Sequence, residues 1–321
     1  MNQKYPKVIV LILSYNGKHL LKEAVSSYLE NDYPNFEVVV IDNGSNDGTK
    51  EYVQKNFPKA KVIRIEKNRG YSGGFNFGLD FAFNKNKADY VLITNNDVKA
   101  DKKVISELVK VAETDEKIGF VTGKVYYYDS PNVFQTVGKK EDQIRWNGDH
   151  IGNREEDKGQ YENISERCFA DDIFTLVSKK LYRDIGGYDT TFFLQSEEYD
   201  WQARAKKLGY KIMYTPYAKI WHKESMTIGR NSALKAYYDA RNPMLVILLH
   251  KSPQFFKRYF WIHFRQDVFR SSLVSLKQLK PLVALKKWQG FFSGIWWGIN
   301  CLLYTSPSPR DLSTSRMPSS A

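Results

Sequence analysis

The sequence predicts an α/β protein built around a parallel β-sheet, and three observations support this fold class. Short apolar runs alternate with stretches of helical pattern through the first hundred residues. Each run ends in a polar turn rich in Gly, Asn and Asp. The 321-residue chain is 42% hydrophobic and 26% charged, which is typical of a folded globular protein. Strands that alternate with helices connect by right-handed crossovers, so neighbouring strands are expected to be parallel.

The first predicted strand runs from Val8 to Leu13, an uninterrupted apolar run typical of a strand buried on both faces. A turn at 14–17 and a helical stretch through Tyr28 follow it. The region 126–165 shows no sustained period and predicts loops and short strands. Further strands are predicted at 36–41, 61–65, 88–93 and 169–180, with a helix at 181–187 that stops at a glycine pair.

The turn after the second strand, residues 42–49, contains glycines that permit positive φ. Ser45 and Asn46 are candidate caps of the helix that follows. In such sheets ligands bind beyond the carboxyl ends of the strands. The turns at 14–17, 42–49 and 94–97 are therefore expected at the ligand-binding edge.

The fourth predicted strand ends at Thr94-Asn95-Asn96-Asp97, where amide and carboxylate side chains are adjacent. These groups supply hard oxygen ligands, which suit Mg²⁺ or Mn²⁺ bridging to a phosphate. Taken alone, the same residues also fit an Asn/Asp turn before the next helix.

A glycine-rich segment covers residues 68–78. Its glycines leave backbone N–H groups free to meet an anion at the start of a helix, and Arg69 adds a charged donor. The spacing matches neither the P-loop nor the dinucleotide fingerprint. A flexible loop is the alternative interpretation.

Three carboxylates, those of Glu197, Glu198 and Asp200, fall within four positions near a predicted helix start. Such close placement is costly unless a cation or a hydroxyl proton uses them, so one is a candidate general base. The alternative is a helix N-terminus that favours acidic residues through its dipole. His222 follows Trp221 and, taken alone, indicates a structural histidine.

The basic character lies in the C-terminal part of the chain. The formal net charge is +12; residues 231–321 carry 13 Lys/Arg against three Asp, whereas residues 1–230 carry a net charge of +2. Nucleic acid and an anionic membrane surface are both candidate partners of such a region. The two distant cysteines argue against a disulfide scaffold or a zinc site, and the absence of a signal segment favours the cytosol.

Four ordered motifs carry a family resemblance: SYNG at 14–17, IDNGSNDGT at 41–49, NRGYSGGFNFGL at 68–79 and TNND at 94–97. They resemble the nucleotide-sugar half of family 2 glycosyltransferases with the GT-A fold, in the rhamnosyltransferase-like branch. The resemblance implies a Rossmann-like, mixed and mainly parallel sheet flanked by helices, plus C-terminal helices. It also implies a GT-A domain at 1–230, with a nucleotide-binding half at 1–100 and an acceptor half at 101–230.

The resemblance further implies a metal site for Mg²⁺ or Mn²⁺. Asp97 is expected to hold the metal, with Asn95 in place of the first Asp of the usual DxD. His222 matches the family's Pro-x-Ala-x-x-x-His pattern and is expected to contact the metal or the diphosphate.

The family's catalytic base lies in an FFxxxEDxDxxxR element, and Glu198 occupies its position here, with Glu in place of Asp. Glu197 and Asp200 are the supporting members of this acidic cluster. Asp42 is expected to contact the base of the nucleotide. The full set expected to bind the nucleotide sugar is Ser14, Tyr15, Asn16, Asp42, Asn43, Asn68, Arg69, Gly70, Gly73 and Asn96.

Residues 231–303 form a basic, aromatic region that predicts helices, and YYxxRN at 237–242 resembles the same branch. The uncharged run at 291–303 is shorter than the ~20 residues that span a bilayer, and 255–303 lacks a clean helical phase, so peripheral attachment is expected. At 304–321 the composition changes abruptly to Ser, Pro and Arg. We expect a non-native or disordered tail there, with the native C-terminus missing.

The sequence therefore predicts an inverting, metal-dependent glycosyltransferase. It is expected to move a sugar from a nucleoside diphosphate, TDP-rhamnose or a UDP-sugar, to a hydroxyl of a lipid-linked glycan or cell-surface polysaccharide precursor. The expected location is cytoplasmic, peripheral on the inner face of the cell membrane. The alternatives are a catalytically silent nucleotide-sugar-binding protein and a basic nucleic-acid-binding protein. The intact acidic cluster argues against the first, and the acidic strand ends, which repel phosphates, argue against nucleic acid as a partner.

Overall fold

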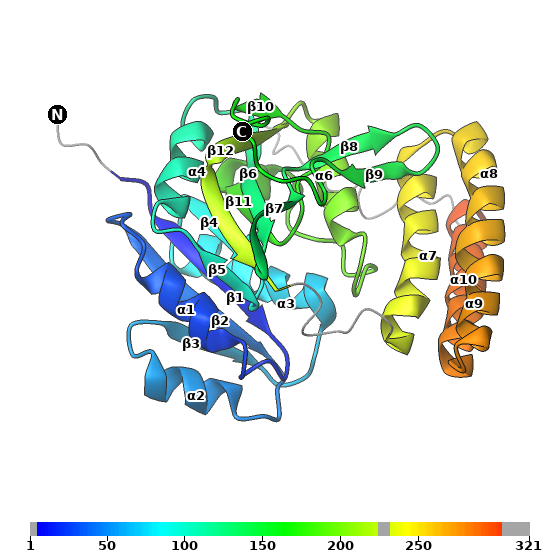
Figure 1. Cartoon of the computed structure of the whole chain (residues 1–321), viewed down its shortest axis with the longest axis horizontal. Helices are drawn as coiled ribbons and strands as arrows, with labels where there is room; N and C mark the ends of the chain where they lie inside the picture. Colours follow the sequence, from blue (N-terminus) through cyan, green and yellow to red (C-terminus); the bar gives the residue numbers. More distant parts are fainter. Residues whose placement is uncertain (1–4, 224–231, 304–321) are drawn as a thin grey trace, which may run out of the picture. The chain divides into compact units, whose positions relative to one another are not determined.

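The computed structural model describes residues 5–223 and 232–303 (Figure 1). The chain divides into two compact units, Met1–Lys235 and Ala236–Ala321. The predicted tail at 304–321 lies outside the described residues.

Within the described residues, ten strands of the first unit form one mixed sheet (Figure 1). Its main path runs β10-β12-β6-β11-β4-β1-β2-β3, while β5 pairs with β12 and β7 pairs with β6. A separate hairpin is formed by β8 and β9. The strands are β1 (Val8–Ser14), β2 (Phe36–Asn43), β3 (Lys61–Ile65), β4 (Tyr90–Thr94), β5 (Val98–Ala100), β6 (Ile118–Tyr127), β7 (Ser130–Thr136), β8 (Lys139–Asp142), β9 (Trp146–His150), β10 (Ser165–Glu166), β11 (Phe174–Ser178) and β12 (Lys211–His222).

The strands predicted in the first hundred residues form one parallel part of the sheet, β3-β2-β1-β4. Their register aligns the carboxyl ends, because Ser14 pairs with Asp42 and Ile12 pairs with Thr94. The antiparallel strand β11 then separates β4 from β6. The predicted polar turns therefore do lie at one edge of the sheet.

Both faces of the central strand β1 are buried, as its apolar run predicts. Val8, Val10 and Ile12 pack on one face, and Ile9 and Leu11 pack on the other. The first face is covered by α1 (Leu21–Leu29), α2 (Thr49–Asn56) and α4 (Val104–Ala112). The second is covered by α3 (Gly70–Leu79), the π-helical turn η1 (Asp80–Lys85), α5 (Lys179–Ile185) and α6 (Glu197–Lys207).

The predicted caps of α2 are wrong. The helix begins at Thr49, and its N-cap is Gly48 with φ of 78° and no side-chain cap bond. Asp47 accepts from the Thr49 backbone N–H at 3.1 Å instead. Ser45 and Asn46 lie too far upstream and bond to the 14–17 turn, as described below.

The longest strand, β12, depends on a close approach to β6. Their parallel pairing shifts register between Tyr214 and Lys219. At this shift a Cβ on Gly123 would lie 2.2 Å from the carbonyl oxygen of Ala218. Only a glycine fits at this point without displacing the backbone of β12.

The second unit consists of helices: α7 (Ala233–His250) leads into it, and α8 (Pro253–Ile262), η2 (His263–Arg270), α9 (Ser271–Lys277) and α10 (Pro281–Leu303) follow. His263 ties η2 to α7, because its Nε2 lies 2.8 Å from the carbonyl oxygen of Ala240. Lys287 of α10 bonds to Ser271 Oγ at 2.9 Å, so α10 folds back along α9. None of the helices among the described residues is long and apolar enough to cross a membrane.

Gly123→Ala tests the close approach of β6 and β12. Because the clash would be with backbone, we expect a loss of about 1–3 kcal/mol in the free energy of unfolding, measured by urea denaturation. Gly119→Ala is the matched control on the same strand, since its Cβ would first meet a side chain, at 3.1 Å. Equal stability changes in the two variants would contradict the proposed role of Gly123.

Candidate active site

A cavity of about 570 Å³ lies at the carboxyl edge of the sheet. It brings together residues from both halves of the first unit. From the first half it is lined by Tyr15, Asn43, Asn68, Gly70, Asn95, Asn96 and Asp97; from the second, by Gln135, Lys139, His150, Asp171, Asp172, Glu197, Glu198 and His222.

Asp97 and His222 form a buried pair in this cavity. Strand β5 starts directly after Asp97 and pairs with the end of β12, where Val98 faces His222. This pairing places the carboxylate Oδ1 3.1 Å from the imidazole Nε2, and both side chains are almost fully buried. Residues far apart in the sequence are thus brought together by one short antiparallel pairing.

Gln135 of β7 determines which nitrogen of His222 faces Asp97. Its Oε1 lies 2.8 Å from Nδ1, so Nδ1 is the nitrogen that donates a proton to the amide. The lone pair of Nε2 then points toward the carboxylate of Asp97, and a cation between them would satisfy both. The carboxylate oxygen of Asp97 suits both Mg²⁺ and Mn²⁺, whereas the imidazole nitrogen of His222 suits a transition metal, so the residues present fit Mn²⁺ better than Mg²⁺.

Asn95 and Asn96 have different surroundings. Asn95 lines the cavity, and its backbone N–H donates to the carbonyl of Ile173. Asn96 is buried and donates to Ser14 Oγ at 3.4 Å. Ser14 itself is not among the cavity-lining residues, so the structure gives it a supporting position below Asn96.

Asn43 clamps the 68–70 turn against the end of β2. Its Oδ1 accepts from the Arg69 backbone N–H at 3.0 Å, and its Nδ2 donates to Asn68 Oδ1 at 3.0 Å and to the Gly70 carbonyl at 2.9 Å. Asn68 Oδ1 also accepts from the Gly70 N–H. These bonds fix the turn that forms one wall of the cavity.

The glycines of the 68–78 segment mainly permit close packing. Gly70 has φ of 71°, and its Cβ would lie 2.2 Å from the Phe193 carbonyl oxygen. Gly78 lets α3 approach the sheet, where a Cβ would meet Ile41 at 2.4 Å. Gly73 packs against its own helix at Arg69, and neither of these two residues is among those lining the cavity.

Asn16 joins the first turn to the second. Its backbone N–H donates to Ser45 Oγ at 3.0 Å, and its Oδ1 accepts from the Asn46 N–H at 2.8 Å. Asn16 has φ of 50°, a conformation that asparagine tolerates better than most residues. Its neighbour Tyr15 is partly exposed and lines the cavity.

Asp42 is fully buried and lies outside the set of cavity-lining residues. Its Oδ1 accepts from the Ser45 N–H at 2.9 Å, and its Oδ2 forms an ion pair with Arg64 of β3. Arg64 also donates to the Ser45 carbonyl. The immediate role of Asp42 in this structure is to hold the 42–45 turn, and Arg64 is a partner that the sequence analysis did not identify.

Asp172, Glu197 and Glu198 form a compact carboxyl cluster, with one oxygen of each lying within 4.8 Å of the others. Burial, with Glu198 and Asp172 nearby, raises the pKa of Glu197 well above its usual value. Burial, with Glu198 and Asp171, likewise raises the pKa of Asp172. Glu197 Oε2 is buried and has no hydrogen-bond partner among the described residues.

Lys139 of β8 is the buried cation of the site. Its ammonium lies 3.2 Å from Glu198 Oε1 and 3.5 Å from Asp171 Oδ2. Burial alone would raise the pKa of Asp171, but Lys139 and His150 hold it below its usual range. Burial alone would lower the pKa of Lys139, but Asp171 and other neighbouring groups raise it well above its usual range. Asp171 and Lys139 therefore form an ionised pair, whereas burial favours the neutral forms of Asp172 and Glu197.

The structure does not bring Asp200 to the cavity. Its carboxylate is fully buried and bonds to Arg204 one turn later, at 2.9 Å. Arg204 in turn donates to the carbonyls of Ile185 and Gly187, so Asp200 joins α6 to the end of α5. The bond to Arg204 accounts for this, because it holds the Asp200 carboxylate toward the end of α5.

The backbone before α6 is strained. Gln195 and Ser196 both have positive φ, 68° and 71°, which non-glycine residues adopt only at a cost of roughly 1–3 kcal/mol each. This conformation starts α6 abruptly and points Glu197 and Glu198 into the cavity.

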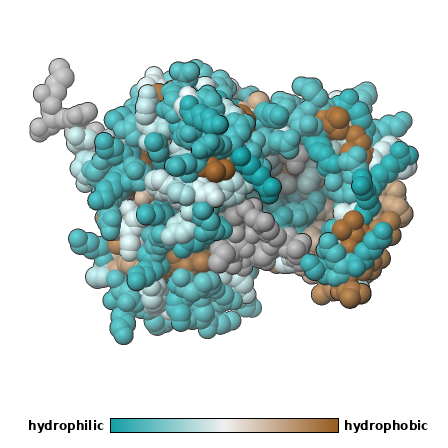
Figure 2. All heavy atoms as spheres, viewed as in Figure 1, coloured by the Kyte–Doolittle hydropathy of each residue, from teal (hydrophilic) through white to brown (hydrophobic). Residues whose placement is uncertain are grey.

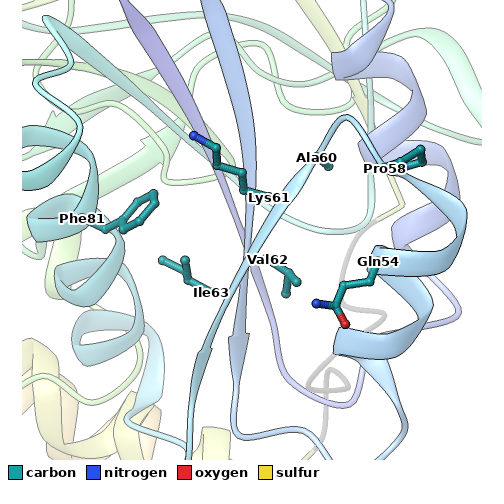
Figure 3. A pocket seen from close by; sticks show the side chains of 7 residues that line it. All are labelled: Gln54, Pro58, Ala60, Lys61, Val62, Ile63 and Phe81. Carbon is teal, nitrogen blue, oxygen red and sulfur yellow. The ribbon is translucent and has the colours of Figure 1, made fainter.

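A second hollow straddles the edge strand β3, with lining residues from α2, β3 and η1 (Figure 3). Val62 and Gln54 lie on one side of the strand, and Ile63 and Phe81 lie on the other. Lys61 is the charged residue of its lining, and it forms an ion pair with Glu37. Because this hollow gathers no group for acid–base or metal chemistry, the first cavity is the candidate active site.

Sequence reasoning missed the cavity residues Gln135, Lys139, His150, Asp171 and Asp172. The first three come from 126–165, where the sequence has no period that would place them. The adjacent carboxylates of Asp171 and Asp172 were a usable signal, since two charged residues inside the strand predicted at 169–180 do not fit a buried strand.

The family model described as glycosyl transferase family 2 matches residues 9–186. Among curated proteins, poly-β-1,6-N-acetyl-D-glucosamine synthases of Staphylococcus epidermidis and of Staphylococcus aureus (strain COL) are each 25% identical to this chain. The matches extend over 233 and 227 residues, which are 71% and 69% of this chain and 52% and 51% of the relatives. The chain thus spans about half the length of these curated relatives.

Three solved structures share the architecture. A Pyrobaculum calidifontis mannosyltransferase in complex with GDP-Man and Mn²⁺ has a TM-score of 0.55 and 16% identity, covering 95% of this chain and 89% of that one. GalNAc-T7 with UDP, GalNAc and Mn²⁺ has a TM-score of 0.59 and 15% identity, and the match covers 88% of this chain and 59% of that one. S. aureus TarS 1–349 has a TM-score of 0.51 and 19% identity, and the match covers 89% of this chain and 81% of that one. The chain therefore has the GT-A fold.

The raised pKa of Glu197 predicts a pH dependence of stability. A carboxyl whose pKa is higher in the folded state binds its proton more tightly there, so its contribution to stability is lost as pH rises from the unfolded value of about 4.3 through the folded one. Glu197→Gln should therefore be more stable relative to the wild type near pH 8 than near pH 5, measured by urea denaturation.

Glu116→Gln provides a control of opposite sign. The hydrogen bond from Lys180 lowers the pKa of Glu116, so this group contributes stability at high pH. Its substitution should make the protein slightly less stable near pH 8. If Glu197→Gln shifts stability in that same direction, the buried neutral carboxyl is the wrong interpretation.

Proposed function

Because the chain belongs to glycosyl transferase family 2 and is a glycosyltransferase, we propose that it transfers one sugar from a nucleoside diphosphate to a hydroxyl with inversion at the anomeric carbon. One observation carries this proposal. Asp97, His222 and Glu198 come from three distant elements, yet they line the same cavity. A candidate metal pair for the diphosphate and a candidate base for the acceptor are thus within one site.

The donor is proposed to bind against the turns that end β1, β2 and β4. Asn43, Asn68 and Gly70 form the wall at the 68–70 turn, and Tyr15 and Asn96 also line the cavity. Ser14, Asn16, Asp42, Arg69 and Gly73 are proposed to support these turns from behind.

Asp97 and His222 are the side chains proposed to hold Mg²⁺ or Mn²⁺, with Asn95 lining the cavity beside them. A divalent cation bound there would neutralise charge on the departing diphosphate. Gln135 keeps the Nε2 lone pair of His222 directed toward the site. Two structural neighbours are complexes with Mn²⁺, which supports a divalent metal in this fold.

Glu198 is proposed to take the proton of the acceptor hydroxyl as that oxygen attacks the anomeric carbon. The bond from this carbon to the diphosphate oxygen breaks, and the electron pair leaves with the diphosphate. Lys139 holds Glu198 Oε1 at 3.2 Å, so Oε2 is the oxygen proposed to accept the proton. Burial raises the pKa of Glu197 and of Asp172, and both are proposed to offer hydrogen bonds to sugar hydroxyls rather than negative charge.

TDP-rhamnose or a UDP-sugar is the proposed donor, and a hydroxyl of a lipid-linked glycan or a cell-surface polysaccharide precursor is the proposed acceptor. The names of the staphylococcal relatives, which are polysaccharide synthases, support a polysaccharide product. We place the reaction in the cytoplasm, on the inner face of the cell membrane, where a lipid-linked acceptor would be available.

Asp97→Ala tests the metal pair. In this variant the Mn²⁺-dependent gain in affinity for a UDP- or TDP-sugar should disappear, because one of the two metal ligands is lost. Gln135→Leu removes the group that orients His222 and should weaken Mn²⁺ binding about 10–100-fold. Isothermal titration calorimetry with and without Mn²⁺ measures both effects. Asp129→Ala removes an exposed carboxylate and should change neither. Unaltered Mn²⁺ dependence in Asp97→Ala would rule out this metal assignment.

Glu198→Gln tests the base. The variant keeps the size of the side chain and removes the proton acceptor, so transfer should fall on the order of 10² to 10⁴-fold while donor binding is retained. Donor consumption with a panel of acceptors measures transfer. Asp200→Asn is the matched control on the same helix, and any loss it causes should appear in the free energy of unfolding. If Glu198→Gln transfers sugar at the wild-type rate, another group is the base.

A further inference from the structure

The hairpin between α9 and α10 exposes a cluster of aliphatic side chains. We define the hairpin tip as residues 273–285, which include the end of α9, the connection and the start of α10. Leu279 in the connection is 89% exposed. The other large exposed hydrophobic residues of the tip are Leu273, Val274, Leu276, Leu282 and Leu285. Figure 2 shows this apolar surface at one end of the C-terminal unit.

The connection at the tip is a fixed turn. Leu279 has φ of 58°, its N–H bonds to the Leu276 carbonyl at 3.0 Å, and the Lys280 N–H bonds to the Ser275 carbonyl at 2.9 Å. Pro281 then begins α10. The backbone therefore holds the most exposed leucine outward in a defined conformation.

Basic residues surround the apolar cluster. Arg270, Lys277, Lys280 and Lys286 fall within or beside the tip, and the sequence from 268 to 303 contains no Asp or Glu. Residues 231–303 as a whole carry 11 Lys/Arg against two Asp. The tip thus combines aliphatic side chains with uncompensated positive charge.

The apolar surface continues along one side of α10. Leu282, Leu285, Phe292, Trp296 and Ile299 are exposed, and at 100° per residue they fall within an arc of about 100° that also contains the exposed Gln289. Ala284 and Phe291 lie on the opposite, buried side. The helix is therefore apolar on both sides, one packed within the unit and one facing outward.

We propose that the hairpin tip inserts its leucines into the outer hydrocarbon of an anionic bilayer, with the surrounding Lys and Arg on the lipid phosphates. Apolar side chains flanked by basic residues are the chemistry of an interfacial anchor. A second copy of this tip is disfavoured as the occupant, because it would place like charges together. Aliphatic residues also lack the flat faces that stack on nucleic-acid bases.

This inference extends the proposed location at a membrane and does not depend on sugar transfer. It adds insertion of the leucines to the attraction between the basic C-terminal region and an anionic membrane surface. It is tested without donor or acceptor, so its failure and that of the proposed reaction would be seen separately.

The test is flotation of the whole protein with vesicles of phosphatidylcholine, alone or mixed with phosphatidylglycerol. The wild type should float with the mixed vesicles. Leu279→Gln should lower the partition coefficient about tenfold, as expected for losing one buried leucine. Leu208→Gln changes a leucine of similar chemistry, exposed at the end of α6, and should have no effect.

The charge variants use the same assay. The double variant Lys277→Glu/Lys280→Glu should bind mixed vesicles at least tenfold more weakly, and Lys102→Glu/Lys103→Glu, exposed beside α4, should not. Bromine-labelled acyl chains should quench a fluorophore placed at Leu279→Cys, which reports insertion directly.

Three outcomes would overturn the proposal. These are absence of flotation with mixed vesicles, equal partition of Leu279→Gln and the wild type, or no quenching by the labelled chains. Concentration-dependent dimers that Leu279→Gln abolishes, measured by light scattering without lipid, would instead assign the tip to contact between copies of this chain.

Discussion

The short antiparallel pairing of β5 with β12 is the constraint on which the site depends. Three pairs of residues hold the end of β12 beside the segment that follows β4. Without this pairing, Asp97 would end a strand in an ordinary polar turn, and His222 would be one of many buried histidines. Gly123 of β6 matters for the same reason, because a side chain there would clash with the Ala218 carbonyl of β12 and displace the strand that carries His222 to Asp97.

The opposite wall is organised by charge rather than by strand pairing. The carboxyls of Asp171, Asp172, Glu197 and Glu198 and the buried ammonium of Lys139 line the same cavity. Their surroundings shift the pKa values of these groups in different directions. Lys139 and Asp171 remain ionised together, while burial favours protons on Asp172 and Glu197. The strained turn before α6 keeps these groups crowded. In this one cavity, burial therefore raises the pKa of two acids while neighbouring cations lower the pKa of a third.

Sequence patterns predicted the parallel part of the fold because buried strands such as Val8–Ser14 are continuous apolar runs. Motif order placed Asp97, Glu198 and His222 in one site, but it could not separate residues that face the cavity from those that support it. Asp42 and Asp200 look like site residues in the sequence, and their partners Arg64 and Arg204 are visible only in three dimensions. The helical phase of α10 was hidden because both of its sides are apolar.

The position of β11 has a consequence for biosynthesis. This strand lies between β4 and β6, so β4 gains its second neighbour only after residues 174–178 have left the ribosome. Until then the nascent chain carries an apolar strand with one open edge, which is the kind of surface that aggregates or recruits chaperones. Closing it requires a contact across about 80 residues, and such long-range pairing slows folding. The strand order thus means that the sheet of the first half is complete only after β11, from the second half of this unit, has paired with β4.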